Sequence, residues 1–211
     1  MKKSKKVSEE VSSNEEDITG IINKLTTETD AESLLRLNGV YYISGEIESG
    51  GLKDICLDIL VKQQLWPKIW KWPLQIIINS PGGVVDEANA LIDIMGNVAM
   101  EVRTTVLGNA SSAAAMIAAA GTKGMRVISP NATMMVHRYT WGIYDKHAEI
   151  VAQRGIEDST HESQVRFWIE HSKYNNKAAV EEHLLKTTNC WMTAKEAIKH
   201  GIVDSISAKF R

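Results

Sequence analysis

The chain has 211 residues, of which 44% are hydrophobic and 24% charged, and its formal net charge is −2. These values are typical of one globular domain and exclude a nucleic-acid binder that works through bulk positive charge. The two cysteines, Cys56 and Cys190, have neither metal-ligand spacing nor the density of a disulfide scaffold, so we expect a reducing, cytoplasmic location and no metal site. The sequence shows neither an apolar run long enough for a membrane span nor the apolar core of a signal peptide.

The first part of the chain predicts an arm followed by a domain. Residues 1–33 are rich in Ser, Glu, Lys, Asn and Thr, which indicates a flexible arm, and residues 34–211 form the expected domain. A buried strand is predicted at 40–43. Apolar residues between Leu52 and Leu60 recur with the spacing of one helix face, so an amphipathic helix should follow.

Strands and helices then alternate along the chain. A strand at 74–78, a tight Asn-Ser-Pro-Gly-Gly loop at 79–83 and a helix over 88–95 form a unit typical of a parallel sheet. A strand at 101–107 leads to an alanine-dense segment at 113–120, which predicts a fully buried helix.

The rest of the chain continues this alternation. The pattern predicts, in order, short strands at 125–128 and 133–136, a long charged helix over 145–173, a closing helix at 194–199 that ends at Gly201, and a short strand at 202–203. The predicted fold class is therefore α/β, built from repeated strand–helix units.

Ser112 is the candidate nucleophile. A catalytic serine needs a base, an acceptor behind that base, and backbone N–H groups that hold the oxyanion. Ser112 opens the alanine-dense helix, where the N–H of Ala113 is a natural oxyanion donor, and the turn at Gly82 and Gly83 offers further N–H groups. His137 follows an apolar strand and is the candidate base. Taken singly, these residues also fit a helix N-cap, an ordinary turn and a structural histidine.

Three motifs in this order and spacing resemble the proteolytic subunit of the Clp protease, ClpP. They are Ile-Asn-Ser-Pro-Gly-Gly at 78–83, Gly-Asn-Ala-Ser-Ser-Ala at 108–113 and Pro-Asn-Ala-Thr-Met-Met-Val-His at 130–137. The segment 192–205 resembles the closing segment of the same family, and the resemblance covers residues 39–206. The four motifs in this order indicate the family much more specifically than any one motif does alone.

The resemblance implies a site and an assembly. Its nucleophile falls on Ser112 and its base on His137, and its oxyanion donors fall on the N–H groups of Gly82 and Ala113, with Gly83 beside them. It further implies a ClpP/crotonase-like spiral of strand–helix units, in which the charged helix protrudes as a handle. The expected partners are copies of the chain in stacked heptameric rings, an AAA+ ATPase unfoldase and a polypeptide substrate, without cofactor, nucleic acid or membrane.

The third position of the catalytic triad departs from the family. The family's aspartate falls on Asn189. An amide can accept the Nδ1 proton of His137 but cannot offset the imidazolium charge, and in serine proteases the change from aspartate to asparagine costs about 10⁴ in turnover. We therefore expect a serine endopeptidase of reduced activity. The alternatives are a non-catalytic ring or scaffold subunit, a peptidase in which Glu181 or Glu182 replaces the missing carboxylate, and a third triad position that lies a residue or two from Asn189.

Two related enzyme classes match the residues of this sequence less well. A crotonase-type acyl-CoA enzyme shares the fold and uses paired N–H groups without a Ser/His pair, and no lysine is singled out as the base of a Ser–Lys peptidase. Arg138 and Tyr139 follow the histidine where the family more often has Gln-Pro. This difference predicts a bulkier, basic lining along the substrate.

Overall fold

The computed structural model describes residues 30–65, 72–139 and 147–207. The chain divides into two compact units, Met1–Val40 and Tyr41–Arg211. In the first unit the described part holds α2 (Ala31–Leu37), where the Asp30 carboxylate caps the helix by accepting the Ser33 N–H. Most of the predicted arm at 1–33 lies outside the described residues, so its boundary stays a prediction.

A mixed sheet forms the centre of the second unit. In the described part of the chain it has seven strands: β1 (Val40–Ile47), β2 (Leu74–Gly83), β3 (Val102–Ser111), β4 (Arg126–Ile128), β5 (Thr133–Val136), β6 (Cys190–Thr193) and β7 (Ser205–Ile206). The order is β1-β2-β3-β4-β7, and β5 pairs with both β3 and β6. The β2–β3, β3–β4, β3–β5 and β4–β7 pairs are parallel, whereas β5–β6 is antiparallel.

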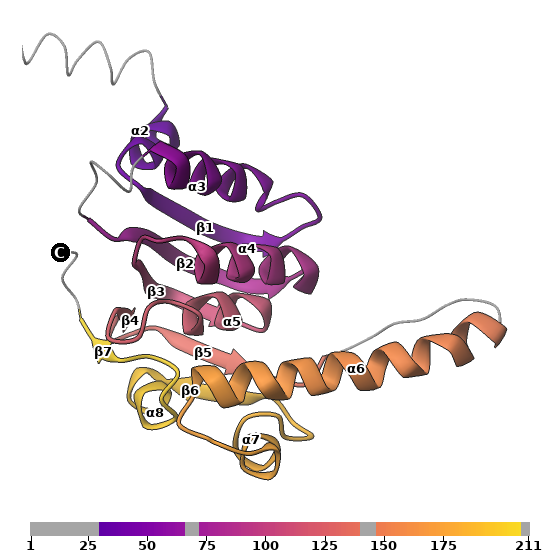
Figure 1. Ribbon diagram of the computed structural model, residues 1–211. Coiled ribbons are helices and arrows are strands. Elements are labelled where there is room, and N and C mark those ends of the chain that lie inside the picture. Colours follow the sequence, from indigo (N-terminus) through magenta and orange to yellow (C-terminus); the bar gives the residue numbers. More distant parts are fainter. Residues whose placement is uncertain (1–29, 66–71, 140–146, 208–211) are drawn as a thin grey trace, which may run out of the picture. The chain divides into compact units, whose positions relative to one another are not determined.

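Three helices cover one face of this sheet. Figure 1 shows α3 (Lys53–Leu65), α4 (Val85–Asn97) and α5 (Ala113–Ala119) side by side in front of the strands. Every residue of α5 is buried, as the alanine-dense segment predicts. Because its side chains are small, this helix packs closely on β2 and β3, and the predicted α/β class is confirmed.

The remaining helices follow β5 and β6. They are α6 (His147–His171), α7 (Lys177–His183) and α8 (Ala194–Lys199), and α6 corresponds to the predicted handle. The C-terminal half of α6 is anchored by the buried side chains of Val165 and Trp168. A capping box between Thr193 and Glu196 begins α8, as its sequence pattern favours. None of the described helices is long and apolar enough to cross a membrane.

Two local predictions were wrong. The expected loop at 79–83 belongs to β2, because a shift in register between Ile78 and Ser80 and positive φ angles of 92° at Gly82 and 149° at Gly83 let the strand continue. The strand expected at 202–203 is not formed. Both of these apolar residues are buried in the connection to β7, so their hydrophobicity reflects core packing and not pairing.

Candidate active site

Ser112 lies at the junction of β3 and α5 in a strained backbone conformation. Its φ is 55°, the only positive value at a non-glycine position among the described residues. Such strain costs about 1–3 kcal/mol and persists only where the surroundings impose it. Here the Ser112 N–H donates to the Met135 carbonyl at 2.8 Å. The Ser112 side chain makes no capping hydrogen bond to α5, so the helix N-cap explanation does not account for its hydroxyl.

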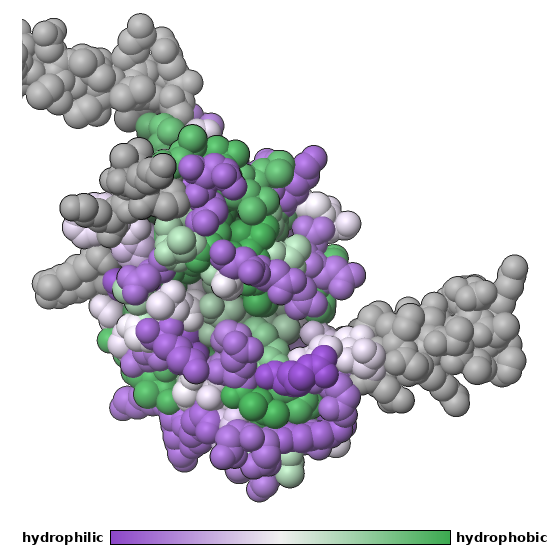
Figure 2. All heavy atoms as spheres, in the orientation of Figure 1, coloured by the Kyte–Doolittle hydropathy of each residue, from purple (hydrophilic) through white to green (hydrophobic). Residues whose placement is uncertain are grey.

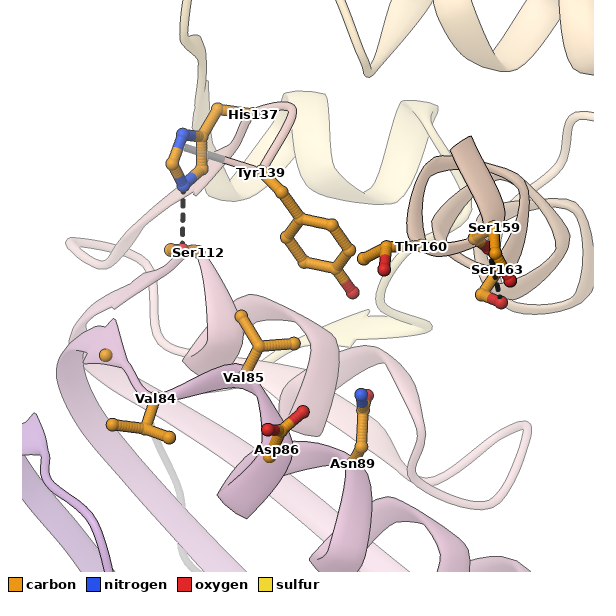
Figure 3. Close-up of a pocket in the computed structure, with 11 residues that line it drawn as sticks. Val84, Val85, Asp86, Asn89, Ser112, His137, Tyr139, Ser159, Thr160 and Ser163 are labelled. Atoms are coloured by element: carbon orange, nitrogen blue, oxygen red, sulfur yellow. Dashed lines mark hydrogen bonds between the residues drawn. The ribbon is translucent and has the colours of Figure 1, made fainter. Parts of the chain in front are cut away.

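His137 lies beside this hydroxyl. Its Nε2 is 2.7 Å from Ser112 Oγ (Figure 3). The contact arises because β5 pairs with β3 in parallel up to Ser111 and Met135, so the residues that follow each strand meet at one edge of the sheet. Burial lowers the pKa of His137, so the imidazole is neutral at neutral pH and Nε2 is able to accept a proton.

The predicted oxyanion residues lie together against the nucleophile. A Cβ added at Gly82 would lie 2.5 Å from Ser111 O and 3.0 Å from Ala113 N, so only glycine fits beside this backbone. Ala113 is the first residue of α5, where an N–H has no acceptor within the helix. The Gly82 N–H donates to Ser80 Oγ at 3.1 Å, whereas Gly83 lines the cavity that contains Ser112.

Asn189 lies across from His137 but is not joined to it. The antiparallel β5–β6 register ends at Val136 and Cys190, which makes His137 and Asn189 the next facing positions. The Asn189 side chain is exposed, and no hydrogen bond links it to His137 in the described structure. The structure thus brings Ser112 and His137 together without engaging the third predicted residue.

The two alternative carboxylates have other neighbours. Glu181 Oε1 is 2.8 Å from His161 Nε2, and Glu182 lies 3.9 Å from His183 Nε2. Within the described ranges neither bonds His137, and burial alone accounts for the lowered pKa of His137. An imidazolium at this position would therefore lack a compensating anion among the described residues.

A cavity of about 550 Å³ opens directly beside Ser112 and His137 (Figure 3). It is lined by Gly83, Val84, Val85, Asp86, Asn89, Ser112, His137, Tyr139, Ser159, Thr160 and Ser163. Of the pair expected to line the substrate, Tyr139 lines this cavity, whereas the Arg138 Nε donates to the Leu185 carbonyl at 2.7 Å, so a basic lining along the substrate stays a prediction. The sequence did not predict the polar residues of α6 that line the cavity, Ser159, Thr160 and Ser163. No local motif marks them, and they reach the cavity only through the folding of the chain.

Metal ligation has no candidate in the part of the chain that the structure describes. No group of three His, Cys, Asp or Glu side chains there could hold a metal ion.

The sheet and its covering helices define a protein of the ClpP/crotonase-like fold class. A family model described as Clp protease matches residues 11–210, and the chain belongs to this family. Its relatives include the ATP-dependent Clp protease proteolytic subunit 1 of Bifidobacterium longum, 29% identical over 84% of this chain and 74% of the relative. Proteolytic subunit 2 of Corynebacterium jeikeium is 30% identical over 79% of this chain and 78% of the relative. Proteolytic subunit 1 of Corynebacterium diphtheriae is 29% identical over 86% and 84%.

Proposed function

We propose that this protein is a Clp-type serine endopeptidase in which Ser112 is the nucleophile and His137 the general base. The observation that carries the proposal is the 2.7 Å separation of Ser112 Oγ and His137 Nε2. His137 takes the hydroxyl proton as Oγ attacks the peptide carbonyl carbon, and the N–H groups of Ala113 and Gly83 hold the developing oxyanion. Gly83 takes the place of the expected donor Gly82, because the Gly82 N–H donates to Ser80 Oγ. The same imidazolium then protonates the leaving amine. In the second half of the reaction, His137 takes a proton from a water molecule that attacks the acyl-enzyme, and it returns this proton to Ser112 Oγ as the acid product leaves.

The activity should be reduced by the absence of an anion behind His137. Burial keeps the imidazole neutral, which prepares it as a base, but the imidazolium formed in the transition state has no carboxylate partner among the described residues. In serine proteases the loss of that partner costs about 10⁴ in turnover. A slow or substrate-restricted peptidase therefore fits these residues best.

A non-catalytic ring or scaffold subunit is the second candidate. The exposed Asn189 side chain, which makes no hydrogen bond to His137, favours it. The strained Ser112 backbone and its contact with His137 speak against it, because assembly alone requires neither. The same Ser/His contact speaks against a crotonase-type acyl-CoA enzyme, whose oxyanion hole works without such a pair.

Covalent labelling separates these candidates. A fluorophosphonate probe should label the wild-type protein and leave Ser112→Ala unlabelled, and a fluorogenic peptide should be cleaved only by the former. Ser111→Ala is the matched control, because Ser111 Oγ is buried and bonded to Asn109 Oδ1 at 2.9 Å. Unlabelled wild-type protein that is folded and assembled would instead establish the scaffold role.

We also propose assembly into heptameric rings, in keeping with the family. The helix α3 exposes Leu57, Leu60, Val61 and Leu65, and Figure 2 shows apolar side chains gathered around it. A contiguous apolar surface of this kind is typical of a protein contact. Sedimentation analysis should give a mass of seven or fourteen chains, and a monomer at micromolar concentration would contradict the proposal. The relatives' description as ATP-dependent further suggests an ATPase partner for this chain.

A further inference from the structure

The cavity beside Ser112 has two chemically different parts. Next to the nucleophile its wall is formed by the apolar side chains of Val84 and Val85 and by the ring of Tyr139 (Figure 3). Farther from the nucleophile it is lined by polar groups. Figure 3 shows Asp86 and Asn89 of α4 below Val85, and Thr160, Ser159 and Ser163 of α6 beyond the Tyr139 ring. A side chain that enters from the nucleophile therefore passes an apolar section before it meets oxygen acceptors.

Asp86 gives the polar end a negative charge. It lies in the first turn of α4, and neither lysine nor arginine occurs among the described residues that line the cavity. Burial raises the pKa of Tyr139 to about 12, and the negative charge of Asp86 contributes to this rise. The carboxylate therefore acts on groups inside the cavity, and the phenol beside it stays neutral.

This arrangement matches a long side chain that ends in a cation. The alkyl stem of lysine or arginine would lie along Val84, Val85 and the Tyr139 ring, while its charged head meets Asp86 and Asn89. An apolar side chain of the same length would gain no electrostatic attraction from the Asp86 carboxylate. A glutamate would meet a like charge.

We propose that this cavity is the specificity pocket for the residue whose carbonyl Ser112 attacks, and that it selects lysine or arginine. The inference rests on the proposed peptidase function and names its substrate class. Asp86 is the specificity-determining residue, and Asn89 supplies an additional acceptor.

The test uses fluorogenic peptide amides that differ only in this residue, which is lysine, arginine, norleucine, leucine or glutamate. Norleucine retains the length of the lysine stem without its charge. We expect kcat/KM to be at least tenfold higher for lysine than for norleucine, and Asp86→Asn to remove most of this preference. Asp93→Asn is the matched control, since Asp93 is exposed on the same helix and does not line the cavity.

A binding measurement keeps the inference testable if turnover is slow. Folded Ser112→Ala protein is titrated with product peptides that end in lysine or norleucine, and the lysine peptide should bind more tightly by a similar factor. Serine-dependent labelling combined with equal or better use of norleucine or leucine would overturn the pocket assignment and leave the peptidase intact. Absence of labelling in wild type, together with equal binding of both peptides, would overturn both.

Discussion

His137 and Asn189 face each other one position beyond the last β5–β6 pair, yet no hydrogen bond joins their side chains. The sheet therefore provides the place for an acceptor behind the imidazole, while the residue at that place remains turned to solvent. The catalytic rate of this protein therefore measures the activity of a serine–histidine pair whose imidazole has no bonded acceptor behind it.

The substitution Asn189→Asp should raise kcat. A carboxylate across from His137 fixes its tautomer and stabilises the imidazolium, and the upper limit of the gain is about 10⁴-fold, the loss seen for the reverse change in serine proteases. Steady-state cleavage of a fluorogenic peptide measures the effect. Thr188→Asp, at the exposed neighbouring position, is the control and should leave kcat unchanged. An unchanged rate in Asn189→Asp would show that position 189 does not reach the histidine.

The pH dependence of kcat/KM should reflect the environment of His137. Only the neutral imidazole accepts the serine proton, so activity falls as the pH drops through the pKa of His137. Because burial lowers this pKa from its ordinary value of 6.5, the acid limb should lie below pH 6.5. In Asn189→Asp the new carboxylate favours the imidazolium and should move the limb to higher pH. A wild-type limb above pH 6.5 would contradict the burial effect.

Gln164 should act as a positioning residue for His137. Its Nε2 donates to the His137 carbonyl at 2.9 Å, while its buried Oε1 has no partner in the described structure. Gln164→Leu removes a hydrogen bond and an unpaired acceptor together, so the effects on stability largely offset each other. We expect kcat to fall tenfold to a hundredfold, on the order expected for a misplaced catalytic group, with little change in KM.

The control for this change is Glu170→Gln, at an exposed position on the same helix. Thermal unfolding is recorded in parallel with kcat and KM. A proportional loss of stability and activity would indicate that Gln164 serves packing alone.

The Arg126–Asp204 ion pair should stabilise the closing segment. Asp204 Oδ1 accepts from Arg126 Nη2 at 2.6 Å, and Oδ2 accepts from the N–H groups of Gly124 and Arg126 and from Arg126 Nε. Burial raises the pKa of Asp204, but these hydrogen bonds outweigh it and hold the pKa below its usual range. Asp204→Asn should cost roughly 3 kcal/mol, the low end for a buried pair because the carboxylate is partly exposed.

The sign of the pH effect follows from the lowered pKa of Asp204. The pair's contribution is complete above the unfolded value near 4 and is lost as the pH falls through the lower folded value. The difference in stability between wild type and Asp204→Asn should therefore shrink in denaturant titrations below about pH 4. Glu162→Gln, which breaks the exposed pair with Lys177, should have a negligible effect. A constant difference at all pH values would contradict this account.

Much of the fold follows from local patterns in the sequence. The alanine-dense segment predicts α5 within one residue, and the closing helix at 194–199 is confirmed, because burial and capping residues act locally there. Helix α7 is not evident in advance, since only Val180 of its seven residues is buried and no apolar stripe marks it. The extension of β2 through Gly83 depends on pairing with other strands, which the glycine-rich sequence does not reveal.

The candidate site likewise contains residues that the sequence motifs predict and residues that only the folded chain brings together. The motifs place Ser112 and His137 beside each other, and the structure has them in contact. The polar end of the cavity joins Asp86 of α4 to Ser163 of α6, so it depends on the packing of two helices far apart in sequence. Likewise the side-chain direction of Asn189 is a property of the folded loop and not of its position in a motif.

The positive φ of 55° at position 112 limits the nucleophiles that this scaffold can carry. Serine, cysteine and threonine all serve as nucleophiles in hydrolases, but a β-branched residue is a severe outlier at positive φ. Replacement by cysteine keeps a single γ atom and leaves the backbone unchanged, whereas threonine would force the turn to rearrange. The scaffold is thus open to conversion into a thiol peptidase and closed to conversion into a threonine peptidase.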